Sequence, residues 1–145
     1  RPYTSTAEMD QDLIRRWNAV VSPEDEIWHL GDFARTGEIA AAVLPQLNGR
    51  KHLIIGNNDA TGGTPQGWES VQPYAEIRRE GRLLVLCHYP FRSWNGQHRG
   101  AVNLHGHSHG RMKPLPRQCD VGVDVWEYAP VALGRLLAAV LRSQP

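Results

Sequence analysis

Four short apolar runs of this chain each end at a polar side chain that can bind a metal ion. Asp32 follows WHLG, Asn57, Asn58 and Asp59 follow LIIG, His88 follows LLVLC, and HGHSHG follows AVNL. Short apolar runs of this kind predict β-strands, and in sheet proteins the loops at the carboxyl ends of neighbouring strands meet at one site. The pattern therefore predicts a sheet protein whose polar residues gather in one cleft.

The remainder of the chain predicts helices between these strands. Apolar residues recur at helical spacing in three segments, and residues 74–88 form two β-rich runs around a polar turn at Glu80 and Gly81. The predicted helices are residues 5–21, 36–47 and 129–141, and the predicted strands outside the hairpin are residues 26–30, 51–56, 101–106 and 119–126. Helices alternating with strands indicate a single α/β or α+β domain, and 145 residues suffice for its core.

Composition excludes several classes of function. The 16 basic and 15 acidic side chains are dispersed and leave a net charge of +1, so there is no strong nucleic-acid signal. No apolar run approaches the roughly 20 residues that span a bilayer, so no membrane partner is expected. The two cysteines show neither metal-binding nor disulfide spacing, which favours a reduced, cytoplasmic setting.

Three histidines at alternate positions, His105, His107 and His109, form the strongest metal-binding signal. The glycines between and after them permit a tight backbone, and an extended chain would project the three rings to one side. Imidazole is the commonest metal ligand, and with carboxylate and amide oxygens it suits divalent Mn, Fe, Zn or Co. A polar loop without metal is the alternative. The isolated His29 and His52 are interpreted as structural residues.

Cys87 precedes His88 and raises a second alternative, a thiol nucleophile activated by histidine. Adjacent residues of a strand point to opposite faces of the sheet. If His88 faces the cleft, Cys87 faces the core. We therefore interpret Cys87 as a small buried hydrophobic residue.

Four motifs, taken in order along the chain, resemble those of the calcineurin-like metallophosphoesterase superfamily. They are GDF at 31–33, GNND at 56–59, CHYP at 87–90 and GHSH at 106–109. Their flanking sequences are similar to its small bacterial and phage-type branch. The resemblance implies a four-layer α/β/β/α sandwich that hydrolyses phosphate esters with the help of two divalent metal ions.

The resemblance also implies a role for each ligand. Asp32 would bridge the two ions, Asn57, His88 and His107 would complete the ligands of one ion, and His109 would bind the other. Mn²⁺ is the expected metal, with Fe, Zn, Co, Ni or Mg as alternatives. Paired ions of this kind activate a water molecule for in-line attack on a phosphate ester.

Two departures from the family pattern affect this interpretation. The expected Asp-x-His motif, which would supply two ligands to the ion at His109, has no counterpart in residues 1–145. Since the chain also begins without Met, we expect an N-terminally truncated single domain that lacks its first strand. We also expect it to bind one metal ion tightly and a second ion more weakly, because the second site lacks half of its expected ligands. Asn58 replaces a histidine that the family uses to assist the leaving group, and an amide cannot donate a proton near neutral pH.

Polar loops offer candidates for the remaining roles. His98 is a candidate substitute acid, and Arg35, Arg92 and Arg99 are candidate phosphate contacts, because guanidinium groups match phosphate geometry. Each of the four could equally be a solvated surface residue.

The leading functional hypothesis is a metal-dependent phosphodiesterase or phosphatase that acts on a small-molecule phosphate ester. A catalytically impaired metal-binding or interaction protein on the same fold is the second hypothesis, because one motif is missing and Asn58 replaces histidine. A zinc hydrolase of acyl or amide bonds is the third, and it predicts a site for one ion.

Overall fold

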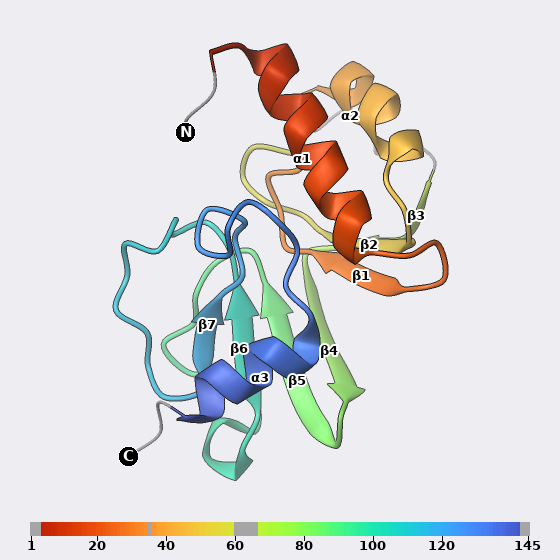
Figure 1. Cartoon of the computed structure of the whole chain (residues 1–145). Helices are drawn as coiled ribbons and strands as arrows, with labels where there is room; N and C mark the ends of the chain where they lie inside the picture. The colour runs from red at the N-terminus through yellow and green to blue at the C-terminus, as the bar shows by residue number, and fades with distance from the viewer. Residues whose placement is uncertain (1–3, 35, 60–66, 143–145) are drawn as a thin grey trace.

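The computed structural model describes residues 4–34, 36–59 and 67–142. These residues form two small β-sheets and three α-helices. In Figure 1 the N-terminal part of the chain surrounds one sheet and the C-terminal part surrounds the other. Among the described residues, no helix combines the length and the apolar character needed to cross a membrane.

The first sheet is parallel and carries two helices. Its strands pair in the order β1 (Glu26–His29), β2 (Arg50–Ile54) and β3 (Trp68–Gln72). The helices α1 (Thr6–Val20) and α2 (Gly37–Val43) lie together over this sheet in Figure 1. The parallel pairing places the carboxyl ends of β1 and β2 at the same edge, where the polar loops begin.

Local sequence signals set the limits of these helices. The Ser5 hydroxyl accepts a hydrogen bond from the backbone N–H of Glu8 at 3.1 Å, which begins α1 as predicted. The predicted helix over 36–47 ends early as an α-helix and continues as a 3-10 turn, η1 (Leu44–Gln46), because Pro45 lacks a backbone N–H. Trp17 of α1 packs into a small core beneath the helix.

The second sheet is mixed. Its strands pair in the order β4 (Tyr74–Arg79), β5 (Arg82–Cys87), β6 (Val102–His105) and β7 (Gln118–Asp120). The first two form the predicted antiparallel hairpin, and the others run parallel to β5. Glu80 and Gly81 have φ of 54° and 73°, as this tight turn requires. A 3-10 turn, η2 (Gln97–Arg99), lies between β5 and β6.

The four-layer sandwich predicted from the family resemblance is wrong. The helix α3 (Leu133–Arg142) crosses the second sheet in Figure 1, and its residues Leu136 and Val140 share one core cluster with Ile54 of β2 and with Leu30, which directly follows β1. This helix therefore packs on the side of the second sheet that faces the first sheet, and not as an outer layer.

The opposite face of the second sheet has no α-helix among the described residues. Val85 points to that face, where Trp94 and Ala101 of the connecting segment cover it. Gly96 and Gly100 adopt positive φ, at 73° and 91°, on either side of η2, so the helical geometry of this segment is limited to that short 3-10 turn. The layer that would have completed the sandwich is replaced by a loop.

Four smaller differences concern three single elements and one residue. β3 was not predicted, because its residues are all partly exposed and show no clean alternation. The predicted strand over 119–126 ends at Asp120, whose carboxylate accepts the backbone N–H of Gly122 at 2.8 Å and starts a turn. The final helix begins at Leu133 and not at 129. Cys87 is half-buried at the end of β5 rather than in the core.

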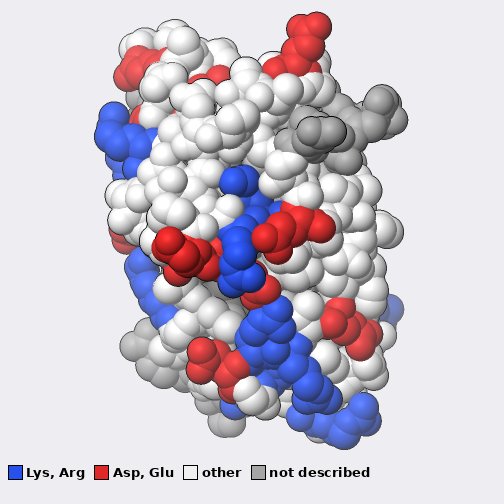
Figure 2. Space-filling model, turned by 90° about the vertical axis from the view of Figure 1, so that its right-hand side faces the viewer, with Lys and Arg blue, Asp and Glu red and all other residues white. Residues whose placement is uncertain are grey.

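Charged side chains link the two sheets and mix on the surface. Arg79 of β4 lies 2.7 Å from Glu26 of β1, and its hydrogen bonds lower the pKa of that carboxyl group. Figure 2 shows basic side chains interspersed with acidic ones, with a band of basic side chains toward the lower end of that face. The predicted lack of nucleic-acid and membrane partners stays a prediction.

Candidate metal centre

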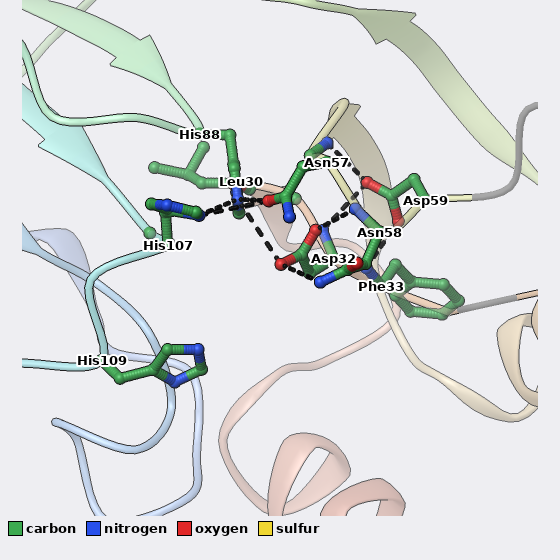
Figure 3. A network of polar contacts seen from close by, with 12 residues as sticks. Leu30, Asp32, Phe33, Asn57, Asn58, Asp59, His88, His107 and His109 are labelled. Atoms are coloured by element: carbon green, nitrogen blue, oxygen red, sulfur yellow. Dashed lines mark hydrogen bonds and ion pairs between the residues drawn. The ribbon is translucent and has the colours of Figure 1, made fainter.

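The loops that follow β1, β2, β5 and β6 meet at one point. His88 is buried, and its Nε2 atom lies 2.7 Å from Oδ1 of Asn57 and 3.2 Å from Nδ1 of His107. Oδ2 of Asp32 lies 3.5 Å from the same Nε2 atom. Ligand atoms of Asp32, His88 and His107 all lie within 4.8 Å of one another. Figure 3 shows that the structure brings together four of the five metal ligands expected from the sequence.

A hydrogen bond on the other side of the His88 ring decides which nitrogen faces this cluster. Nδ1 lies 2.8 Å from the carbonyl oxygen of Leu30, which can only accept, so Nδ1 carries the proton. Nε2 of the neutral ring is then an acceptor, and it faces two further acceptors, the Asn57 amide oxygen and the Asp32 carboxylate. Acceptors that converge in this way need a proton or a metal ion between them. These nitrogen and oxygen donors fit a divalent ion.

Three of the expected ligands lie in strained backbone. Asp32, His107 and His109 have φ of 59°, 66° and 50°, in the left-handed region that non-glycine residues rarely adopt. Each such residue costs on the order of 1 kcal/mol, and strain of this kind concentrates at functional sites. The backbone conformation that orients these side chains therefore lowers the stability of the fold.

Asn58 holds the carboxylate of Asp32. Its backbone N–H donates to Oδ1 at 2.7 Å, and its side-chain amide donates to Oδ2 at 3.2 Å. Asn58, at the position where the resemblance leads us to expect a histidine, is therefore a hydrogen-bond donor to the Asp32 carboxylate.

Asp59 joins the loops after β1 and β2. This carboxylate is only 8% exposed and accepts three backbone N–H groups, from Gly56 at 2.6 Å, Asp32 at 2.9 Å and Phe33 at 2.6 Å. Buried charge is tolerated when hydrogen bonds satisfy it, as they do here. The bonds fix Asp32 relative to the loop that carries Asn57.

Glycines allow the three loops to approach His88 this closely. A Cβ atom on Gly31 would lie 2.4 Å from the His88 Nδ1 atom, and one on Gly56 would lie 2.5 Å from the backbone nitrogen and Oδ1 of Asp32. Neither contact is tolerable without a shift of the backbone. Gly106 also packs against the His88 ring, with its virtual Cβ 3.6 Å away. Gly31 and Gly56 are therefore required by contact, whereas the space at Gly106 is tight but closer to ordinary van der Waals distances.

His29 precedes the site and is uncharged near neutral pH. Its Nδ1 atom accepts the backbone N–H of Gly31 at 3.2 Å, and its ring meets the edge of Phe33 at 5.2 Å. Burial lowers the pKa of His29 to about 4, although the charges of Asp59 and Asp32 act in the opposite direction. The other isolated histidine, His52, stacks on Trp28 at 4.2 Å. Both contacts agree with structural roles.

His109, the fifth expected ligand, lies apart from the cluster. Figure 3 shows its ring away from His88 and Asn57. Its Nδ1 atom lies 2.6 Å from Oδ2 of Asp124. One cavity of about 530 Å³ is lined both by His109 and by residues of the cluster. Its polar lining residues at this end include Asp32, His88, His107, His109, Asp120 and Asp124, and Asp25, Glu26, His29 and Arg79 also line it. The neighbouring His105 is buried outside this cavity lining, with Nδ1 2.8 Å from the Gly106 carbonyl.

His98 and Arg99 lie at the far end of the second sheet. They form the exposed turn η2, and the next residue accepts a hydrogen bond from Arg82 at the start of β5. His88 follows the other end of β5. The structure therefore does not bring His98 or Arg99 to the cluster.

Neither of the two remaining arginine candidates is assigned to the cluster. Arg92 is exposed on the loop whose neighbours Phe91 and Trp94 cover the outer face of the second sheet. Arg35 lies outside the described residues.

The sequence interpretation assigned no role to three carboxylates. Asp59 was included among the polar residues that follow LIIG, and its capacity to accept nearby backbone N–H groups was the available signal for its structural role. Asp120 and Asp124 lie in DVGVD, outside the four motifs, and their only signal is an aspartate after a strand.

Comparisons with known proteins give relatives but no activity. No family model matches the chain. The chain is 31% identical over 152 residues to the Gene 66 protein of Mycobacterium phage D29, covering 81% of this chain and 76% of that protein. It is 29% identical over 154 residues to an uncharacterized protein of Methanocaldococcus jannaschii, covering 99% of this chain and 82% of that protein.

One solved structure has a similar fold. The crystal structure of a protein of unknown function from Aquifex aeolicus matches 96% of this chain and 89% of its own, with a TM-score of 0.71 and 20% identity. At that identity the similarity concerns the fold alone. It supports the two-sheet arrangement described above in place of the four-layer sandwich.

Proposed function

The chain belongs to the family of the Gene 66 protein of Mycobacterium phage D29, and we propose that it is a metal-dependent phosphoesterase. The order and chemistry of the four motifs in the metallophosphoesterase resemblance support this function. The four-layer architecture that the resemblance implied does not. The observation that carries it is the convergence of Asp32, Asn57, His88 and His107 on one point.

The chain's residues would divide the work as follows. Asn57, His88, His107 and Asp32 would hold one divalent ion, and His109 and Asp32 would provide ligands for a second. Divalent ions, when bound there, polarise phosphoryl oxygens and lower the pKa of a water molecule. Mn²⁺ is the ion we expect, because mixed oxygen and nitrogen donors suit it. The cavity beside the cluster admits the ester.

The substrate preference follows from Asn58. Both of its donors are directed at Asp32 in the structure, at 2.7 Å and 3.2 Å. An amide cannot protonate a departing alkoxide. The proposed enzyme therefore favours small-molecule phosphate esters with good leaving groups.

The cytoplasm is part of the same proposal. Cys87 and Cys119 are both free thiols. Burial raises the pKa of the Cys119 thiol to about 11, which keeps it protonated and unreactive. Free thiols are typical of a reducing compartment.

Hydrolysis of a chromogenic phosphodiester with and without Mn²⁺ tests the function. We expect Mn²⁺-dependent release of the chromophore by the wild-type chain and its loss in Asp32→Asn, which keeps the shape of the side chain but removes its charge. Asp10→Asn, a substitution in α1, is the matched control and should retain full activity.

Two other outcomes would favour the alternative functions. Tight Mn²⁺ binding without hydrolysis of any phosphate ester would indicate a metal-binding or interaction protein. Zn²⁺-dependent hydrolysis of a chromogenic acyl ester, without phosphoesterase activity, would indicate the acyl or amide hydrolase. Either result would refute the proposal.

A further inference from the structure

His109 and Asp124 form a histidine–carboxylate pair outside the cluster of four ligands. Nδ1 of His109 lies 2.6 Å from Oδ2 of Asp124, and an ionised carboxylate can only accept, so Nδ1 carries the proton. The lone pair of the neutral ring is then on Nε2, the nitrogen on the far side from Asp124. The His109 side chain is 56% exposed and the Asp124 side chain is 25% exposed, so the carboxylate is the more buried partner of the pair.

The turn after β7 holds Asp124 in place. The backbone N–H of Val125 donates to the carbonyl of Gly122 at 3.0 Å, and that of Trp126 donates to the carbonyl of Val123 at 3.0 Å. These bonds close the chain on both sides of Asp124. The carboxylate is therefore presented from a turn with fixed geometry.

Asp120 ties this turn to the loop that carries His109. One of its oxygens accepts the N–H of Gly122 at 2.8 Å, and the other accepts the N–H of Gly110 at 2.8 Å. Gly110 directly follows His109, whose own backbone has a φ of 50°. The backbone of His109 and the carboxylate that faces its ring are thus fixed to each other through one residue.

We propose that Asp124 is a positioning residue that holds His109 in the Nδ1–H tautomer, so that Nε2 of His109 binds the second divalent ion. This inference rests on the proposed function, because it assumes that second ion. His88 shows the same arrangement within the cluster, since its Nδ1 donates to the Leu30 carbonyl and its Nε2 faces the other ligands. Histidines that bind metals generally hold their second ring nitrogen in this way.

The tautomer of His109 tests the proposal without any metal. ¹⁵N NMR of the metal-free chain, at a pH where the His109 ring is neutral, distinguishes a protonated Nδ1 from a protonated Nε2. We expect Nδ1–H in the wild-type chain and in Asp124→Asn, whose amide oxygen can still accept, and loss of that preference in Asp124→Ala. A wild-type ring protonated at Nε2 would refute the proposal, even if Asp124→Ala did not fold.

Mn²⁺ titration gives the second measurement. Loss of such a supporting carboxylate typically weakens metal binding 10- to 100-fold, so Asp124→Ala should weaken the weaker of two Mn²⁺ sites by about that factor and leave the tighter site unchanged. Glu127→Ala, which removes an exposed carboxylate from the same turn, should change neither site. Equal weakening of both sites would indicate a general structural role and overturn the proposal. A wild-type chain that binds the second ion but hydrolyses no phosphate ester would overturn the proposed function and leave this inference standing.

Discussion

Nε2 of His88 and Oδ1 of Asn57, which lie 31 residues apart in the sequence, approach within 2.7 Å. The opposite ring nitrogen of His88 donates to the Leu30 carbonyl, so the contact brings two acceptors together. Oδ2 of Asp32 and Nδ1 of His107 complete the group. A divalent ion at this point would have these four atoms as its ligands.

Mn²⁺ should stabilise the wild-type chain but not a chain that lacks one of these ligands. A free ion concentration of 100 times the dissociation constant adds about 2.7 kcal/mol to the free energy of unfolding. His107→Ala removes an exposed side chain that we propose as a ligand, and the variant should lose most of this gain. Thermal melting with and without Mn²⁺ measures it, with His98→Ala as the matched control. The same Mn²⁺-dependent gain in both variants would exclude His107 as a ligand.

Asp59→Ala should destabilise the fold even without metal. The carboxylate accepts three backbone N–H groups in the buried junction between the loops after β1 and β2. Leaving these donors unpaired should cost about 3 kcal/mol or more. Urea unfolding with a chelator present measures the loss, and Glu24→Ala, an exposed carboxylate, is the control. A cost below about 1 kcal/mol would show that water replaces these bonds.

Gly56→Ala should disrupt the cluster. The added methyl would lie 2.5 Å from the backbone nitrogen and Oδ1 of Asp32, so the loop must move. We expect a loss of about 2 kcal/mol and weaker Mn²⁺ binding. Gly37→Ala meets no atom within 4 Å and should leave both quantities nearly unchanged. Wild-type Mn²⁺ affinity in Gly56→Ala would contradict the close packing described for this loop.

Acid should destabilise the chain through His29. Burial lowers its pKa to about 4 in the folded chain, against about 6.5 for an exposed histidine. Between these values the unfolded chain binds a proton that the folded chain does not, so stability is full above pH ~6.5 and falls toward pH ~4, by at most ~1.4 kcal/mol per pH unit.

The variant His29→Asn isolates this effect. Its amide oxygen can still accept the Gly31 N–H but does not titrate in this range. Urea unfolding in the presence of a chelator, at about pH 7 and about pH 5, should show a smaller decline for the variant than for the wild-type chain. Parallel declines would assign the acid sensitivity to other groups.

Sequence patterns predicted the local elements better than their assembly. The Ser5 cap and the turn at Glu80 depend on short-range chemistry, and the structure confirms both. The apolar side of α3 could pack on either face of the second sheet, so the sequence did not show which face the helix covers. A family resemblance in four motifs did not extend to the layer order.

At the site, too, some features could be predicted from the sequence and others could not. Residues at strand ends could be predicted to converge, because parallel strands end at a common edge. The supporting residues could not, since Asp59 and Asp124 act through hydrogen bonds that cross from one loop to another. The position of His98 could not be predicted either, because the length of the segment between β5 and β6 does not tell which end of the sheet its turn occupies.

The most direct test of the metal centre is anomalous diffraction from crystals of the chain grown with Mn²⁺. We predict a strong peak in contact with Nε2 of His88, Oδ1 of Asn57, Nδ1 of His107 and the carboxylate of Asp32. Absence of a peak at this point, with Asn57 and His88 still in direct contact at saturating Mn²⁺, would contradict the account.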